Sequence, residues 1–100
     1  MKHIQEYVMQ IREELEGAKD YAEKSLYWKY EGNDNRYRQY HSMAEQELSH
    51  SSIIHQLAVE DIDKMKQRGY NPTAEMEEQW QKSHAEYVEK VAWIKQMLAM

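Results

Sequence analysis

The sequence predicts an all-α protein in which a long antiparallel helical hairpin is followed by a third helix. Apolar residues recur at steps of three and four along most of the chain, which is the period of an α-helix. Two short polar segments that contain glycine, at 31–35 and 69–73, interrupt this period. No segment shows the alternating pattern of a strand. We therefore expect one domain over residues 1–100, with helices at about 3–31, 35–68 and 72–99.

The first helix has the clearest apolar row, with Glu14 and Tyr21 beside it. The row consists of Ile4, Val8, Ile11, Leu15, Ala18, Ala22 and Ser25. Gly17 stands in mid-helix, where glycine costs about 1 kcal/mol relative to alanine. It indicates either close approach by a neighbouring helix or a tolerated substitution.

The two connections carry residues that end and begin helices. Gly32 and Gly69 suit the position just past a helix end. The residues able to cap the second helix are Asn33, Asp34 and Asn35, and those able to cap the third are Thr73 and Asn71, the latter with Pro72 as the first helical residue. A loop as short as the first one forces the two long helices to run antiparallel.

The second helix places a carboxylate and an imidazole on the stripe expected to face the core. This stripe consists of Tyr40, Met43, Glu47, His50, Ile54 and Leu57. A buried carboxylate is tolerated when it is paired, protonated or bound to a metal, and a neutral histidine is a natural co-ligand. The Glu47-x-x-His50 spacing alone is weak evidence, because a chain rich in Glu and His supplies it by chance.

Counting from the hairpin turn brings Glu14 to the same level as this pair. With a turn near Asn33, Glu14 and Glu47 differ by about 7 Å in axial height. We therefore expect Glu14, Glu47 and His50 to converge. Two carboxylates with one imidazole suit Fe, Mn or Zn better than Mg or Ca. The alternative is a buried polar network that fixes helix register without metal.

Composition restricts the class of partner. The net charge is -5, and no basic patch with interleaved aromatic residues favours nucleic acid. No apolar run approaches the ~20 residues that span a bilayer, and the N-terminus lacks the apolar region of a signal peptide. We expect a cytoplasmic protein without a membrane partner. Because the chain has no cysteine, any metal would be held by oxygen and nitrogen atoms.

The third helix carries an apolar stripe and an aromatic surface. The stripe consists of Met76, Trp80, Tyr87, Val91, Ile94 and Leu98, and the surface available to a protein partner comprises Trp80, Tyr87, Trp93 and Met97. Three long helices make a thin bundle. Dimerisation through the hairpin would give the commoner four-helix cross-section.

The remaining histidines are expected to be structural or solvated. His3 is near the terminus, and His41 and His55 fall off the stripe of the second helix, so we expect them in solvent. His84 either packs beside Trp80, which we favour, or completes a site within one chain together with Glu77.

The two segments Glu14-Leu-Glu-Gly-Ala-Lys-Asp-Tyr21 and Tyr40-His-Ser-Met-Ala-Glu-Gln-Glu-Leu-Ser-His50 resemble the first half of a ferritin-like di-iron protein. The pattern is closest to bacterioferritins and rubrerythrins and covers about residues 10 to 60. The resemblance implies that Glu14 is a terminal iron ligand, Glu47 a bridging carboxylate and His50 the nitrogen ligand. Tyr21 would lie just behind the ligands, where it or Tyr40 would donate a hydrogen bond or an electron; alternatively, both rings only fill helix interfaces.

A complete ferritin-like chain repeats this ligand set on two further helices, which this chain lacks. The remedy is a homodimer, or a higher even-numbered oligomer, in which two hairpins form a four-helix bundle around two irons. The short encapsulated ferritins are similar in this respect. Leu48 occupies the position at which bacterioferritins carry the haem-ligating methionine, so the resemblance implies no haem.

Two function classes follow. The first is a dimeric non-haem metal protein that binds two irons, or Mn or Zn in the same ligands, and serves Fe(II) oxidation, storage or detoxification. Whether it turns over as a ferroxidase is left open. The second is an inactive helical interaction or structural protein that has the hairpin and docks a partner through its third helix.

Overall fold

Three α-helices form the computed structural model, which describes the backbone of residues 2–100 and the side chains of residues 4–100. They are α1 (Lys2–Tyr30), α2 (Asp34–Gln67) and α3 (Ala74–Leu98). The predicted all-α class is confirmed, and the helices begin and end within two residues of the expected positions. The side chain of His3 lies outside the described part of the chain.

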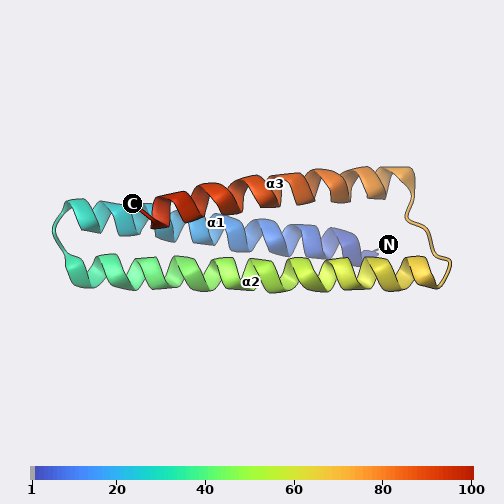
Figure 1. The fold of residues 1–100 in the computed structure, drawn as a ribbon, viewed down its shortest axis with the longest axis horizontal. Helices are drawn as coiled ribbons and strands as arrows, with labels where there is room; N and C mark the ends of the chain where they lie inside the picture. Colours follow the sequence, from blue (N-terminus) through green and yellow to red (C-terminus); the bar gives the residue numbers. More distant parts are fainter. Residues whose placement is uncertain (1) are drawn as a thin grey trace.

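The helices lie side by side in a rod of 56 × 18 × 17 Å. Figure 1 shows that α1 and α2 run antiparallel and that α3 returns along them, parallel to α1. The helix α1 packs closely along the length of α2 and less closely along α3, whereas the backbones of α2 and α3 approach each other at few points. Most of the contacts between helices are therefore made within the hairpin of α1 and α2.

In both connections, the predicted residues end one helix and begin the next. Gly32 and Gly69 have φ angles of 76° and 84°, in the left-handed region that glycine adopts without strain. The Asn33 side chain caps α2 by accepting a hydrogen bond of 3.1 Å from a backbone N–H three residues later. Thr73 caps α3 in the same way at 3.2 Å, so the alternative cap Asn71 is not used.

Small residues form the contact between α1 and α2. The whole apolar row predicted for α1 is buried. The half of this row nearer the turn to α2 consists of Ala18, Ala22 and Ser25. On α2 the fully buried positions are Ala44, Ser51 and Ala58, which follow one another at steps of seven. The hydroxyls of Ser25 and Ser51 each donate a 2.7 Å hydrogen bond to a carbonyl of their own helix, so neither is unsatisfied.

The predicted core stripe of α2 was wrong by part of a turn. Met43 and Leu57 are 37% and 46% exposed, and His50 is also exposed. The error has a physical cause: the stripe was traced through large apolar residues, whereas closely packed helices meet through small ones. Large side chains then flank the contact, and those on the side without a third helix stay uncovered.

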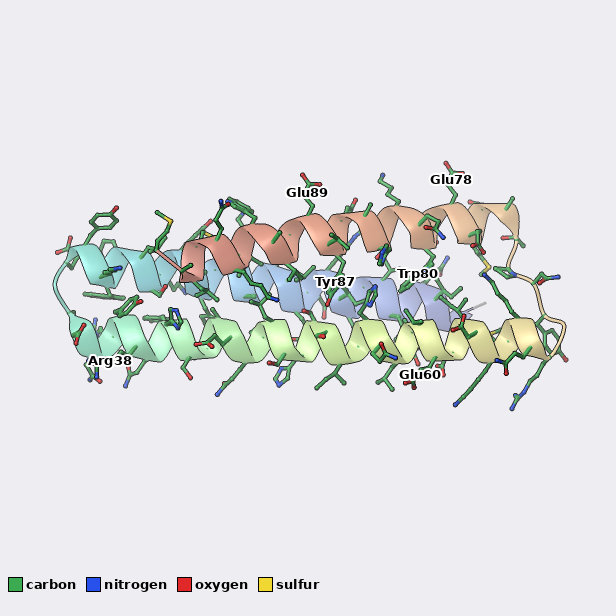
Figure 2. All side chains as sticks on the ribbon, viewed as in Figure 1. Arg38, Glu60, Glu78, Trp80, Tyr87 and Glu89 are labelled. Atoms are coloured by element: carbon green, nitrogen blue, oxygen red, sulfur yellow. The ribbon has the colours of Figure 1, made fainter. Side chains whose placement is uncertain are left out.

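The third helix folds onto the hairpin of its own chain. It buries Trp80, Ser83, Ile94 and Met97. In Figure 2, Trp80 and Tyr87 lie between α3 and α2, while Glu78 and Glu89 point away. Because Trp80 and Met97 are internal, the large apolar side chains that α3 leaves exposed are Val88 and Trp93.

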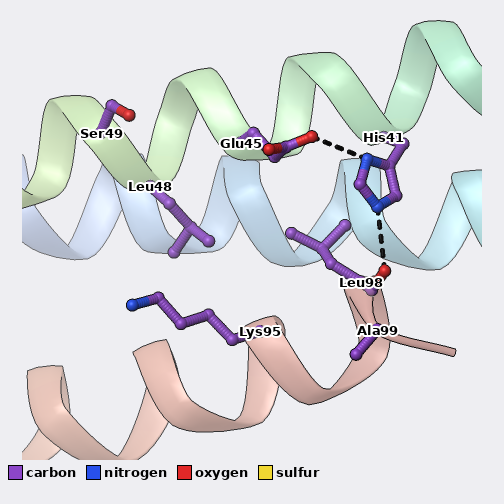
Figure 3. Close-up of a pocket in the computed structure, with 7 residues that line it drawn as sticks. All are labelled: His41, Glu45, Leu48, Ser49, Lys95, Leu98 and Ala99. Carbon is purple, nitrogen blue, oxygen red and sulfur yellow. Dashed lines mark hydrogen bonds and ion pairs between the residues drawn. The ribbon is translucent and has the colours of Figure 1, made fainter.

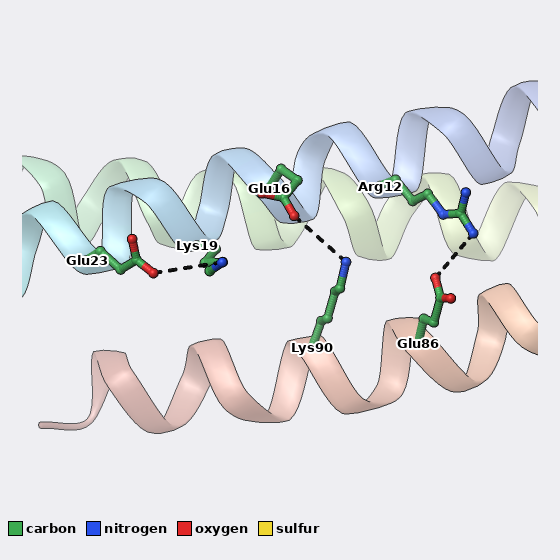
Figure 4. A network of polar contacts seen from close by, with 6 residues as sticks. All are labelled: Arg12, Glu16, Lys19, Glu23, Glu86 and Lys90. Carbon is green, nitrogen blue, oxygen red and sulfur yellow. Dashed lines mark hydrogen bonds and ion pairs between the residues drawn. The ribbon is translucent and has the colours of Figure 1, made fainter.

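Polar contacts complete the attachment of α3. At its C-terminal end, His41 Nε2 of α2 donates to the Leu98 carbonyl at 2.9 Å (Figure 3). Along α1, Arg12 pairs with Glu86 at 3.3 Å and Glu16 with Lys90 at 3.9 Å (Figure 4). Exposed ion pairs of this kind contribute about 0–1 kcal/mol each, so burial of the apolar residues holds α3 in place.

Within the part of the chain that the structure describes, no helix is long and apolar enough to cross a membrane.

Enlarging a residue in the α1–α2 contact is expected to destabilise the fold. Ala44→Leu adds a branched side chain where no space exists, so the free energy of unfolding should fall by about 1–3 kcal/mol, as measured in urea. Ser42→Leu, at an exposed position of the same helix, is the control and should change it by less than about 0.5 kcal/mol. Equal effects of the two substitutions would contradict the close packing described above.

Candidate metal centre

Glu14 of α1 and Glu47 and His50 of α2 come together across the hairpin. One ligand atom from each lies within 4.8 Å of the other two. The His50 Nδ1 atom is 3.6 Å from Glu14 Oε2 and 3.8 Å from Glu47 Oε1. The convergence expected from counting along the sequence is therefore observed. This is the only group of three such side chains within one ion's reach among residues 4–100.

The cluster lies on the flank of the hairpin that faces away from α3. On α1, Arg12 and Glu16 pair with α3, and Glu14 is two residues from each, about 200° around the helix. On α2, His41 and His55 contact α3. His50 is nine residues after His41 and five before His55, so it points toward the opposite side of α2.

The cluster is partly open to solvent. The side chains of Glu14 and Glu47 are 28% and 26% exposed, and that of His50 is 57% exposed. The expectation that these residues face a dry core is thus wrong for the single chain. Exposed apolar residues of α2 surround His50 on this flank: Met43, Ile53 and Leu57 are 37%, 59% and 46% exposed.

The two carboxylates of the cluster are close enough to share a proton. A hydrogen bond to Glu14, burial and the negative charge of Glu14 raise the pKa of the Glu47 carboxyl, while the nearby His50 opposes the shift. Without a cation, Glu47 therefore holds its proton more tightly than an isolated glutamate does. A cation held by both carboxylates would displace that proton.

Gly17 provides the space for the Glu47 carboxylate. A Cβ atom built on Gly17 would lie 3.0 Å from Glu47 Oε2. The mid-helix glycine indicated that a neighbouring helix comes close to α1, and the group that comes close is the Glu47 side chain of α2. The sequence held the signal, but it did not tell which residue of the neighbouring helix occupies the space.

Tyr21 and Tyr40 form a stacked pair about two helical turns from the cluster, on the side of the turn between α1 and α2. Their ring centroids are 6.2 Å apart at 29°, and the Lys24 ammonium lies 5.9 and 5.8 Å from the two centroids. In the described part of the chain, no hydrogen bond joins either phenol to Glu14, Glu47 or His50. Tyr21 follows Glu14 by seven residues and Tyr40 precedes Glu47 by seven, so both rings lie on the flank of the cluster.

On the same flank, on the other side of the cluster, the Tyr7 hydroxyl donates a hydrogen bond to Asp61. This bond is the main reason why the pKa of Tyr7 is raised. Sequence reasoning missed the pair, although Tyr7 precedes Glu14 by seven residues and Asp61 follows Ile54 by seven, so both continue the rows of the cluster.

The histidines outside the cluster contact α3, which corrects two expectations. His41 is partly buried, and its Nδ1 atom is 2.8 Å from Glu45 Oε1 while its Nε2 atom binds the end of α3. It borders a groove of about 400 Å³ between α2 and α3 that is lined by His41, Glu45, Leu48, Ser49, Lys95, Leu98 and Ala99 (Figure 3). The His41 imidazole and the Glu45 carboxylate that line this groove already pair with each other, so the groove offers no free set of ligands for a cation.

His55 is also partly buried rather than solvated, and it meets His84 of α3 with 2.9 Å between the two ring nitrogens. The His84 and Trp80 rings both lie against the His55 ring, with centroids 5.1 and 5.5 Å from it, so His84 lies on the same side of α3 as Trp80. The Glu77 carboxylate is instead 3.7 Å from the Lys66 ammonium.

No known protein family, curated protein or solved structure matches the chain significantly. Conclusions about function therefore depend on the chemistry of the cluster and on the pattern of the sequence.

Replacing Glu47 by glutamine should stabilise the metal-free protein at neutral pH. A raised carboxyl pKa means that the folded state holds the proton more tightly than the unfolded state does. The stabilisation is present below the usual value of 4.5 and is lost as the pH rises through the raised pKa. Glu47→Gln keeps an uncharged donor for Glu14, so it should avoid this loss.

The measurement is the free energy of unfolding in chelator at several pH values between about 4 and 8. The advantage of Glu47→Gln over wild type should grow with pH, whereas Glu13→Gln, next to Glu14 but exposed, should show no such trend. Parallel pH profiles for wild type and Glu47→Gln would contradict a proton shared by the two carboxylates.

Proposed function

We propose that the chain binds Fe(II) through Glu14, Glu47 and His50 and oxidises it in a two-fold homodimer, as a ferritin-like protein of minimal length. The observation that supports the proposal is the convergence of two carboxylates and one imidazole within 4.8 Å of one another. Its sequence counterpart is the joint spacing of Glu14, Tyr21, Glu47 and His50, which is the spacing that resembles ferritin-like proteins.

The donor set fits an ion such as Fe(II). Nitrogen and oxygen atoms bound to one such ion at about 2.0–2.2 Å are separated by about 3 to 4 Å. The observed separations of 3.6 and 3.8 Å fall in this range, so small rotations of the side chains suffice for binding. One chain offers two carboxylates, and in their ionised form these neutralise the charge of one Fe(II) ion.

A second copy of the chain would complete the site. Three protein ligands leave an ion on this flank open to water, and the flank is exposed and carries the uncovered apolar side chains of Met43, Ile53 and Leu57. Joining two hairpins by a two-fold axis through this flank buries those side chains and brings two ligand sets together. The product is a four-helix bundle with four carboxylates and two imidazoles around two ions.

The residues divide the work of oxidation. Glu14 and Glu47 hold the charge of the substrate ion as it rises from Fe(II) to Fe(III), and His50, the most exposed of the three, provides the nitrogen ligand on the open side. Each Fe(II) gives up one electron. Two of them therefore reduce one O2, with two protons, to hydrogen peroxide, or reduce one peroxide, with two protons, to two waters.

Fe(II) titration of the purified chain tests the proposal. Under anaerobic conditions the wild type should bind one Fe(II) per chain and sediment as a dimer; on admission of air the ion should be oxidised. Alanine at Glu14, Glu47 or His50 should each weaken Fe(II) binding by at least ~10-fold and slow oxidation.

Glu13→Ala is the matched control because Glu13 is exposed and adjacent in sequence to Glu14, and it should behave as wild type. Wild-type binding and oxidation by Glu47→Ala would refute the metal site. A metal-loaded monomer would refute the shared site, and binding of Zn or Mn without oxidation of Fe(II) would refute the oxidase activity.

Gly17→Ala is expected to separate stability from metal binding. Alanine favours the helix by up to about 1 kcal/mol, but its Cβ atom would lie 3.0 Å from Glu47 Oε2 and would shift that carboxylate by a few tenths of an ångström. The variant should therefore unfold at a temperature equal to or above that of wild type and bind Fe(II) several-fold more weakly. Unchanged Fe(II) affinity would show that Glu47 does not bind the ion from its present position.

A further inference from the structure

A pair of histidines lies between α2 and α3, apart from the cluster proposed to bind iron. His55 Nε2 and His84 Nδ1 are 2.9 Å apart. His55 follows His50 by five residues, about 140° around α2. The two histidine positions therefore face different sides of α2, and a ligand of one pair cannot serve the other.

Aromatic rings of α3 hold His55 in place. Its ring is stacked on that of Tyr87, with centroids 4.2 Å apart and planes at 10°, and lies 5.5 Å from the Trp80 ring at 27°. Figure 2 shows Trp80 and Tyr87 in the space between α3 and α2. One imidazole is thus fixed by packing, whereas His84 is exposed and can adjust.

The two nitrogens are already as close as adjacent ligands of a metal ion, but with ring centroids 5.1 Å apart they point at each other, so the exposed His84 ring must rotate for both nitrogens to face one ion. Two nitrogens that bind one ion at about 2.0–2.1 Å, with a right angle between the bonds, are about 2.9 Å apart. Burial and His84 lower the pKa of His55, so its imidazole is unprotonated at neutral pH. The proton that the two rings share in their hydrogen bond is the one that an ion would replace.

We propose that His55 and His84 form a second metal site, a two-imidazole clamp between α2 and α3 that binds Cu(II) or Ni(II). Right-angled nitrogen ligands are typical of the square geometries of these two ions, and imidazole affinity rises toward Cu(II) across the divalent series. Water supplies the remaining ligands on the exposed side of His84. The carboxylates of Glu14 and Glu47 suit Fe(II), so the two sites differ in the ions they select.

The clamp would join two helices whose backbones touch at few points. Binding should therefore raise the melting temperature by holding α3 on the hairpin. This effect does not depend on the proposed iron chemistry.

Cu(II) titration tests the clamp through the fluorescence of Trp80, which stacks near His55. The parent chain carries His3→Gln, because a histidine at the third position binds Cu(II) and Ni(II) together with the amino terminus, and Glu47→Ala and His50→Ala to remove the proposed iron site. Trp28→Phe and Trp93→Phe leave Trp80 as the only tryptophan. One equivalent of Cu(II) should quench the emission, and the electron paramagnetic resonance spectrum of the bound ion should show two nitrogen ligands.

In the same parent, His84→Asn should weaken Cu(II) binding at least ~10-fold and abolish the rise in melting temperature with Ni(II). His41→Asn, which removes another histidine between α2 and α3, should leave both effects intact. If His84→Asn binds Cu(II) as tightly as the parent, or if Trp80 is not quenched, the clamp does not exist.

Discussion

The close approach of α1 to α2 through small side chains determines most of the other features. Ala18 and Ala22 of α1 and Ala44, Ser51 and Ala58 of α2 are all buried. Residues of this size leave little space between the helix axes and little freedom to slide, so the contact fixes both the distance and the axial register of the hairpin. Side chains of moderate length that flank the contact then meet their counterparts on the other helix. Glu14 reaches Glu47 and His50 because the register puts them at one level, and the missing side chain of Gly17 lets the Glu47 carboxylate lie against α1.

A repeat of seven residues gives α2 two different flanks on either side of this contact. His41, Leu48 and His55 belong to the flank beside α3, where they contact it or border its grooves. Met43, His50 and Leu57 belong to the opposite flank and are exposed, and none of the described helices packs over them. A three-helix chain can cover only one flank of its hairpin. The uncovered flank holds the acidic cluster, and it is the flank through which a second hairpin would complete a four-helix bundle.

The sequence predicted the helices and the members of the cluster better than it predicted which residues are buried. Periodicity, caps and glycines were sufficient for the helices because these signals are local. Counting from the turn was sufficient to bring Glu14 to Glu47 because an antiparallel hairpin fixes axial height. The same reasoning failed for Met43, Leu57 and His50, since it assumed that large apolar residues mark the core. It also left His55 in solvent, because the rings that cover His55 come from α3, and the path of α3 is not encoded in the period of α2.

The hydrogen bonds within the cluster help to decide between two interpretations. The cluster is either a metal site or a polar network that only fixes the register of the helices. A network that serves packing is expected to have its hydrogen bonds made at rest, as the bond from Tyr7 to Asp61 on the same flank is. The cluster differs in its histidine. A hydrogen bond between the two carboxyl groups raises the pKa of Glu47. The His50 nitrogen is 3.6 and 3.8 Å from their oxygens, beyond hydrogen-bond distance but suited to a shared ion. Such an arrangement places a glycine in mid-helix, at a cost of about 1 kcal/mol relative to alanine. A divalent cation would satisfy all three side chains at once, and for this reason we favour the metal site over the network.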